Sequence, residues 1–317
     1  MIRANPKVTD SSFLFFAVSD DRFVQKVAEH QHGSSYPAVT DLAVLQESIP
    51  LPPLPEQRAI ARVLSTLQRA IETQDKLIAA ARHVKKALMR HLFTYGAVPP
   101  ADAARVPLKE TQIGAVPERW EVVRLGEVAD FKNGINFKRE QKGRGILTVD
   151  VLNMYSDSIY LQMQNLYRVD VNPSDENLLR ENDILFVRSS LKREGVGWST
   201  LFQEHAEPVT FCGFLIRARL TSTGIFPEFL VDFLRLASVR SMLVSKSEKV
   251  AITNINQGNL KSLPIPSPPL SEQRAIARIL AAVDQKIATE EKRKAALQTL
   301  FKTTLHQLMT GQMRVKA

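Results

Sequence analysis

The sequence predicts a mixed α/β protein in which one α/β domain is flanked by two long helices that pair as an antiparallel coiled coil. The first observation behind this prediction is an internal repeat, because Pro53–Leu64 returns 216 positions later as Pro269–Leu280. The second is a heptad stripe of apolar residues behind each copy, and the third is a set of short strand-like runs between the copies. Two matched helices around one insert follow from these observations.

Each copy of the repeat opens with a proline-rich run. Proline fixes φ and disfavours helical geometry in the residue before it, so the helices are expected to begin near Glu56 and Glu272. An acidic residue in the first turn complements the helix dipole, and Ser271 is predicted to be the N-cap of the second helix. Gly96 and Gly311 are predicted to end the two helices.

Behind each start, residues at alternating steps of four and three form an apolar stripe, which is typical of a coiled-coil seam. The first seam comprises Ile60, Leu64, Leu67, Ile71, Gln74, Ile78, Ala81, Lys85, Leu88 and Leu92. The second seam comprises Ile276, Leu280, Val283, Ile287, Glu290, Lys294, Leu297, Phe301, Thr304 and Leu308. The polar residues within both seams are expected to fix the register at some cost in stability. The alternative is a pair of ordinary amphipathic core helices.

The insert between the repeats is predicted to be a mixed α/β domain with short strands. Strand-like runs lie at 121–125, 145–149, 183–187 and 214–218. A helix is expected after Pro227, over 228–235. Residues 13–18 resemble that helix, so residues 1–48 are interpreted as the truncated end of a second copy of the domain. The predicted order is a remnant at 1–48, a first arm at 49–96, the α/β domain at 97–262 and a second arm at 263–317.

The composition of the 317-residue chain favours a protein that works in a reducing compartment. No apolar run approaches the roughly 18 residues of a membrane-spanning helix, so no membrane contact is expected. The amino terminus lacks the apolar core of a signal peptide, and the single Cys212 cannot form an internal disulfide. A cytoplasmic protein is therefore expected.

The net charge of +9 lies mainly on the two predicted arms. Two interpretations remain open: the charge marks a solvated helix exterior, or it marks a surface for nucleic acid or an acidic partner. The insert is nearly neutral overall, but basic residues cluster locally within it. Such local clusters can bind phosphate.

The motif Pro-Pro-Leu-x-Glu-Gln-x-x-Ile, present twice and followed each time by a long predicted helix, resembles the conserved regions of the specificity subunit of type I restriction-modification systems. The segment at 114–128, GAVPERWEVVRLGEV, resembles the start of a target recognition domain in that family. In the family, two such domains each read half of a bipartite DNA site and an antiparallel pair of helices separates them. The resemblance covers nearly the whole chain, with the first recognition domain reduced to residues 1–48.

The resemblance implies a non-catalytic subunit that recognises double-stranded DNA and directs modification (methyltransferase) subunits, and a restriction subunit, to a target site. It implies no cofactor and no catalytic residue in this chain. Because one chain would hold one complete recognition domain, a homodimer would restore two readers on a symmetric target. The alternative from another class is an inactive remnant, or a coiled-coil scaffold that does not read DNA.

A DNA-reading domain needs Lys or Arg for phosphates and polar side chains for base edges, on segments that reach a groove. Three polar segments fit: 132–139 around a glycine turn, 188–197 as a loop leaving a strand, and 253–257, which alternatively caps the next turn. The predicted DNA-binding residues are Lys132, Asn136, Lys138, Arg139, Arg188, Ser189, Ser190, Lys192, Arg193, Asn254 and Asn256. The alternative is that these are ordinary solvated segments.

The same insert lacks the motifs of the enzymes that act on DNA. By comparison with those enzymes, an adenine methyltransferase needs an Asn/Asp-Pro-Pro-aromatic segment and a glycine-rich cofactor loop, and neither Asn172-Pro173-Ser174 nor Gly195-Val196-Gly197 provides one. Asp130, Glu140 and Lys142 have the composition of a metal-dependent nuclease site, but such spacings often arise by chance. The histidines lack Cys or acidic partners at zinc spacing, so no metal site is expected.

Overall fold

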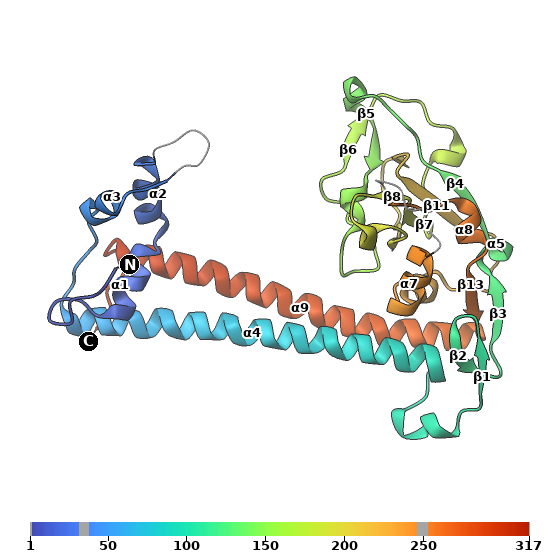
Figure 1. Cartoon of the computed structure of the whole chain (residues 1–317), viewed down its shortest axis with the longest axis horizontal. Helices are drawn as coiled ribbons and strands as arrows, with labels where there is room; N and C mark the ends of the chain where they lie inside the picture. Colours follow the sequence, from blue (N-terminus) through green and yellow to red (C-terminus); the bar gives the residue numbers. More distant parts are fainter. Residues whose placement is uncertain (1, 32–37, 246–252, 317) are drawn as a thin grey trace. The chain divides into compact units, whose positions relative to one another are not determined.

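The computed structural model describes residues 2–31, 38–245 and 253–316 and divides into two compact units. Unit 1 comprises residues 1–82 and 286–317, and unit 2 comprises residues 83–285. Two long helices, α4 (Leu54–Tyr95) and α9 (Leu270–Met309), contribute residues to both units (Figure 1). Among the described helices, none combines the length and the apolar character needed to cross a membrane.

Unit 1 consists of three short helices and the adjoining parts of α4 and α9. The short helices are α1 (Ser11–Val18), α2 (Asp21–Glu29) and α3 (Asp41–Gln46). Each begins at a polar cap that satisfies a free backbone N–H group of the first turn. The cap is Asp10 for α1, Asp20 for α2 and Thr40 for α3.

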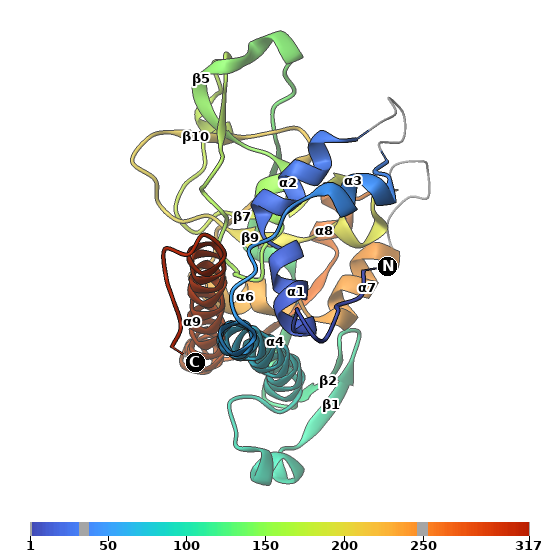
Figure 2. The same ribbon diagram turned by 90° about the vertical axis from the view of Figure 1, so that its left-hand side faces the viewer.

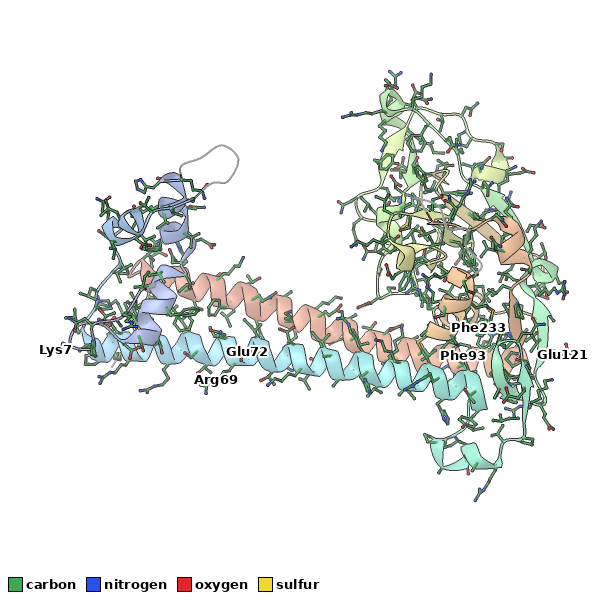
Figure 3. The ribbon with its side chains drawn as sticks, in the orientation of Figure 1. Lys7, Arg69, Glu72, Phe93, Glu121 and Phe233 are labelled. Atoms are coloured by element: carbon green, nitrogen blue, oxygen red, sulfur yellow. The ribbon has the colours of Figure 1, made fainter. Side chains whose placement is uncertain are left out.

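In unit 1 the helices α4 and α9 run antiparallel and are joined by polar contacts. The Gln74 side-chain amide donates to the Glu290 carbonyl oxygen at 3.2 Å and also to the Glu290 carboxylate, and Lys294 pairs with Asp75 at 2.6 Å. Every residue of the two predicted seams is buried or half-buried. The predicted antiparallel coiled coil is therefore confirmed, and α4 residues outside its seam, such as Arg69 and Glu72, are exposed (Figure 3).

The core of unit 1 forms where α1 packs on the paired helices, an arrangement visible in Figures 1 and 2. Phe13 and Phe16 of α1 belong to one buried cluster with Ile60 and Leu64 of α4. Residues near the end of α9, among them Leu305, complete this cluster. The amino-terminal segment thus buries its aromatic residues against both long helices.

Each copy of the repeat buries one glutamine that ties the helix start to the chain before it. Gln273 donates two hydrogen bonds of 2.8 Å, to the carbonyls of Gly224 and Pro268, and accepts one of 2.7 Å from the Phe226 amide. Gln57 makes the three corresponding bonds at residues 216 positions earlier. The repeat in the sequence is therefore also a repeat of structure, in which a buried polar group has all its partners.

Both long helices begin two residues earlier than predicted. The predicted N-cap Ser271 is wrong, because it is the second residue of α9 and the Pro269 carbonyl already accepts the Glu272 N–H at 2.9 Å. Gly96 directly follows α4 with a φ of +84°, a left-handed conformation that favours glycine. Gly311 follows the end of α9 with a φ of +73°. The two predicted helix ends are thus confirmed.

Unit 2 contains the predicted α/β domain, whose strands form small sheets. The central antiparallel sheet has the order β4 (Ala129–Asn133), β11 (Leu215–Leu220), β7 (Ile184–Val187), β9 (Ser199–Leu201). A second sheet has the order β10 (Val209–Phe211), β5 (Lys142–Val149), β6 (Tyr167–Val169), with β10 parallel to β5. Three antiparallel ribbons pair β1 (Leu108–Thr111) with β2 (Gly114–Pro117), β3 (Glu121–Arg124) with β13 (Pro264–Ser267), and β8 (Ser189–Ser190) with β12 (Thr253–Asn254).

The helices of unit 2 are short apart from its portions of α4 and α9. The α-helices are α5 (Leu125–Val128), α6 (Pro227–Leu234), α7 (Ala237–Ser245) and α8 (Gln257–Lys261). The 3₁₀ helices are η1 (Pro100–Arg105), η2 (Arg139–Gln141), η3 (Val151–Met154), η4 (Asp175–Asn177) and η5 (Arg193–Gly195). The four predicted strands overlap β3, β5, β7 and β11, and the helix predicted after Pro227 is α6.

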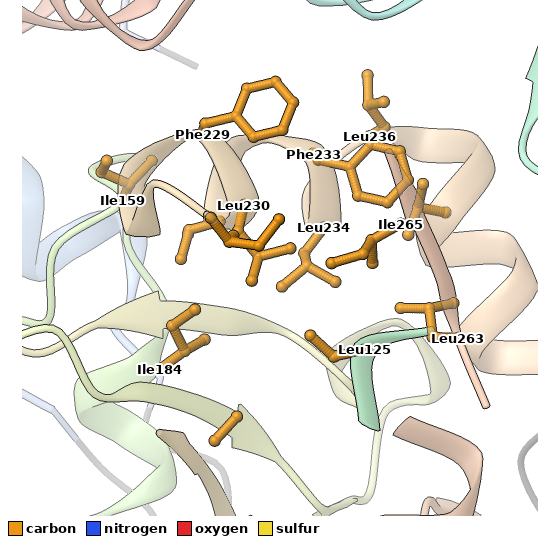
Figure 4. Close-up of a cluster of buried hydrophobic side chains, with 14 of the residues drawn as sticks. Leu125, Ile159, Ile184, Phe229, Leu230, Phe233, Leu234, Leu236, Leu263 and Ile265 are labelled. Atoms are coloured by element: carbon orange, nitrogen blue, oxygen red, sulfur yellow. The ribbon is translucent and has the colours of Figure 1, made fainter. Parts of the chain in front are cut away.

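The main core of unit 2 surrounds α6, which is buried on two sides. Figure 4 shows Leu230 and Leu234 on the side of α6 that faces the sheet and Phe229 and Phe233 on the other side. The ring of Phe93, from α4, lies 5.2 Å from that of Phe229 and 5.6 Å from that of Phe233 (Figure 3). Hence α6 joins the sheet to the unit 2 portion of α4.

One carboxyl group is buried beside this core. Asp232 of α6 is 2% exposed and its Oδ1 has no hydrogen-bond partner among the described residues. Burial raises the pKa of Asp232 to about 7, against the smaller opposing effect of the Lys85 ammonium, which pairs with Asp284 at 2.6 Å. The carboxyl is therefore protonated in mildly acidic solution and charged above neutral pH.

Replacing Asp232 by asparagine is expected to remove a pH-dependent loss of stability. Because the pKa is about 7 in the folded state and about 4 in the unfolded state, folding binds the proton more tightly. The stability contribution is therefore full at low pH and is lost as the pH rises towards 7. From pH 5 to pH 8 the free energy of unfolding of Asp232→Asn should rise by about 2 to 3 kcal/mol relative to the unmodified chain.

Urea unfolding at the two pH values measures this difference. Glu181→Gln, which alters an exposed carboxylate of the same unit, is the control and should follow the unmodified chain. Parallel pH profiles for Asp232→Asn and the unmodified chain would contradict the assignment.

Candidate nucleic-acid interface

The first predicted segment starts inside a strand, which corrects the expectation of a loop. Lys132 and Asn133 are the last two residues of β4 because β11 supplies their backbone partners. Beyond them, the Gly134 amide donates to the carbonyl of Leu215, the first residue of β11, at 3.1 Å. The Ile135 amide donates to the carbonyl of Phe211, the last residue of β10, at 2.9 Å. A Cβ on Gly134 would overlap the Cys212 carbonyl, so glycine permits this close approach.

The second segment also differs from the expected loop. Ser189 and Ser190 form β8, which pairs with β12 so that Asn254 lies opposite Ser189. The Arg188 carbonyl extends this pairing by accepting the Ile255 N–H at 3.0 Å. A partner strand more than 60 residues further along the chain therefore converts the serines from loop to strand.

Polar contacts join all three predicted segments in unit 2. The side-chain amide of Gln257 donates to the Asn133 side-chain oxygen at 3.1 Å. Gly213 connects the first segment to the second. Its carbonyl accepts from the Arg188 guanidinium at 3.4 Å, and its amide donates to the Ile135 carbonyl at 2.8 Å. We call the residues 132–139, 188–192 and 254–257 the polar surface.

The predicted site residues differ in how they lie on the polar surface. The exposed ones are Asn136, Lys138, Arg139, Lys192 and Asn256. The half-buried ones are Lys132, Arg188, Ser189, Ser190 and Asn254. Asn256 is the N-cap of α8, where its side chain accepts the Asn259 N–H at 2.9 Å, so the alternative role as a cap is confirmed for this residue. The side chain of Arg193, which was also predicted, lies outside the described residues.

The cations of unit 2 fall into two groups. Lys132 pairs with Glu176, Arg144 with Asp170 at 2.6 Å, and Arg168 with Glu207 at 2.8 Å. In contrast, the cations without an ion pair in the described part of the chain include Lys138, Arg139, Arg188 and Lys192. The polar surface therefore carries positive charge that no described carboxylate neutralises.

Three residues near these segments were absent from the predicted set. Asn133 and Gln257 make the bond that joins two segments, and both already stood within predicted segments. Lys142, from a basic cluster that the sequence shows, lies 4.3 Å above the ring of Tyr167. The hydroxyl of Tyr167 donates to the Asp150 carboxylate at 2.8 Å, and burial together with this bond raises the pKa of Tyr167. Composition alone gave no signal for the pairing of Asn133 with Gln257.

An open cavity of about 870 Å³ adjoins the polar surface, between η3 and the segment from β8 to η5. Its wall is mainly apolar and aromatic and includes Leu152, Tyr155, Leu191, Trp198 and Phe214. Polar residues line it as well, namely Ser189, Ser190 and Lys192 of the polar surface and the carboxylates Asp150 and Glu194. The Arg235 guanidinium lies 4.6 Å from the centre of the Trp198 ring, and burial lowers the pKa of Arg235 to about 10.

Comparison with known proteins places these observations in a family context. The model of the type I restriction modification DNA specificity domain matches residues 1–81 and 117–299. The specificity subunit of type I restriction enzyme MjaVIII from Methanocaldococcus jannaschii is 28% identical over 98% of this chain and 72% of its own length. A specificity subunit named as putative, MjaX from the same organism, is 29% identical over 84% of this chain, which spans 60% of that relative.

A solved chain confirms the fold. It comes from a structure concerned with complex assembly and conformational transition of the type I R-M system. The TM-score is 0.59 with 23% sequence identity, over 97% of this chain and 73% of the other. Long paired helices next to a mixed α/β domain are thus shared with that chain.

Proposed function

Since the chain belongs to the type I restriction-modification DNA specificity family, we propose that unit 2 reads double-stranded DNA through the polar surface. The observation that carries this proposal is the meeting of three polar segments around cations without described ion-pair partners. Such cations suit phosphates, and the neighbouring Ser, Asn and Gln side chains suit base edges. The proposed contacts are made by Lys132, Asn136, Lys138, Arg139, Arg188, Ser189, Ser190, Lys192, Arg193, Asn254 and Asn256.

The proposed role is recognition without catalysis. In this proposal, modification subunits bind the chain and carry out methylation at the site that it selects, and a restriction subunit joins the same complex in the cytoplasm. The exposed basic faces of α4 and α9 supply docking surfaces for these partners. Residues 97–262 act as the target recognition domain, residues 1–48 as a remnant of another, and the segments 49–96 and 263–317 as the arms.

Adenine methylation across a genome tests this proposal. Cells that express the chain together with its neighbouring modification subunit are compared by single-molecule sequencing with cells that lack only this chain. A new split motif that depends on the chain is expected. An assembled complex that methylates no new motif would contradict DNA reading and would favour a scaffold.

The proposed reader works as a homodimer. Two copies of one recognition domain related by a two-fold axis favour a target whose halves are inverted repeats. Mass photometry of the complete complex measures the number of chains, and the methylated motif reports the symmetry. One chain per complex together with a non-palindromic motif would contradict the dimer while leaving DNA reading intact.

A further inference from the structure

Two leucines project from unit 2 at the rim of the cavity beside the polar surface. Leu152 is 83% exposed and Leu191 is 87% exposed, and Phe214 and Tyr155 expose 57% and 40% of their surface next to them. Single exposed apolar residues are ordinary, but a group of them around an apolar cavity marks an interaction site. This group serves no core of the described structure.

Both leucines lie in or next to backbone segments that hydrogen bonds hold in place. Leu152 lies in η3, whose cap Asp150 accepts the Val151 N–H at 2.7 Å and the Tyr167 hydroxyl at 2.8 Å. Leu191 directly follows β8, which pairs with β12. The leucine side chains are therefore presented by ordered backbone, as a binding contact requires.

The surroundings of the leucines identify the chemistry of the ligand. Lys192 and Arg188, neither with an ion pair in the described part of the chain, lie in the same segment as Leu191, and the Ser189 and Ser190 side chains line the same cavity. Two carboxylates, Asp150 and Glu194, line the cavity too. A ligand that suits this combination therefore presents an apolar group to the leucines and directs its negative charge toward Arg188 and Lys192. Major-groove base edges display one apolar group, the 5-methyl group of thymine.

We propose that Leu152, Leu191 and the cavity between them recognise a thymine of the DNA target through its 5-methyl group. This inference rests on the proposed DNA reading and adds a specificity-determining contact to it. The cations hold the backbone, the hydroxyls face polar base edges, and the leucines discriminate thymine from bases that lack the methyl group. A target that contains adenine in each half always offers a thymine on the opposite strand.

Deoxyuridine provides the test, because it differs from thymidine only by the methyl group. The probe is a duplex that carries the motif found by methylation sequencing, with each thymine replaced in turn, bound by the complex of this chain with its modification subunit. At one thymine per half-site the replacement is expected to weaken binding about fourfold, the value of one buried methyl group. Leu152→Ala and Leu191→Ala should each bind the thymine and uracil duplexes more nearly alike.

Leu45→Ala, which truncates a leucine 74% exposed in unit 1, is the matched control and should keep the full discrimination. The two test variants alter exposed side chains, so their melting temperatures should equal that of the unmodified chain. The thymine contact is overturned if no uracil replacement weakens specific binding, or if both variants still distinguish thymine from uracil as well as the unmodified chain does. Either result leaves the proposed DNA reading intact. Loss of modification-subunit binding in the variants assigns the leucines to a protein partner and overturns the thymine contact too. A complex that binds no specific DNA overturns both proposals.

Discussion

Replacing Arg188 and Lys192 together by alanine is expected to weaken DNA binding by the assembled complex about 10- to 100-fold near physiological salt. Neither side chain has an ion pair in the described part of the chain, so the substitution leaves no carboxylate of that part unpaired. If both contact phosphates, the slope of log affinity against log salt concentration should fall by roughly 2. Fluorescence anisotropy with duplex DNA at several salt concentrations measures both quantities.

The control for this experiment is a cation of unit 2 that already has a partner. Arg168 pairs with Glu207 at 2.8 Å, so Arg168→Ala should change DNA affinity and its salt dependence much less. Binding of the modification subunit should be unchanged in both variants. Equal losses in the two variants would show that the effect is general electrostatics and not contact by Arg188 and Lys192.

Replacing Phe229 by alanine is expected to lower the stability of unit 2 by about 3 to 5 kcal/mol. Its ring is fully buried and lies 5.2 Å from that of Phe93 and 6.4 Å from that of Trp120. Truncation therefore removes both apolar burial and aromatic contacts, and leaves a cavity between α6 and α4. Hydrogen exchange read out by mass spectrometry should show loss of protection throughout unit 2, and DNA binding should fall with it.

The repeat supplies a matched substitution in the other unit. Phe13 stands 216 positions before Phe229, is 1% exposed and packs against Ile60 and Leu64 of α4. Phe13→Ala should therefore reduce protection in unit 1 while the sheets of unit 2 remain protected. Identical exchange patterns for the two variants would contradict the division of the chain into two separately packed units.

The features that depend on local sequence could be predicted, and those that depend on distant partners could not. The repeat, the helices and their seams followed from periodicity, which is a local property. Ser189 and Ser190 were assigned to a loop because their polar composition says nothing of a partner strand at Thr253. Lys132 was misplaced for the same reason, since β11 makes its surroundings a strand.

The side-chain contacts of the candidate site could not be predicted from the sequence for the same reason. The three segments were predicted from composition, but their contact through Gln257 and Gly213 depends on folding. Leu152 and Leu191 belong to a residue type that is usually buried, so only the structure reveals that they are exposed. Serine is a residue type that favours the N-cap position, yet α9 already begins at Leu270, directly after Pro269. Ser271 therefore lies inside the helix.

The backbone hydrogen bonds around Gly134 and Gly213 affect how new DNA specificities can arise. The bend at 134–136 is held by amide-to-carbonyl bonds, and added Cβ atoms would overlap the Cys212 carbonyl at one glycine and the Asn136 side chain at the other. The framework therefore depends little on what the neighbouring exposed side chains are. Evolution can exchange the residues at 138, 139 and 192 while keeping the two glycines. A library varied at those three positions therefore samples DNA-binding preferences on an unchanged backbone.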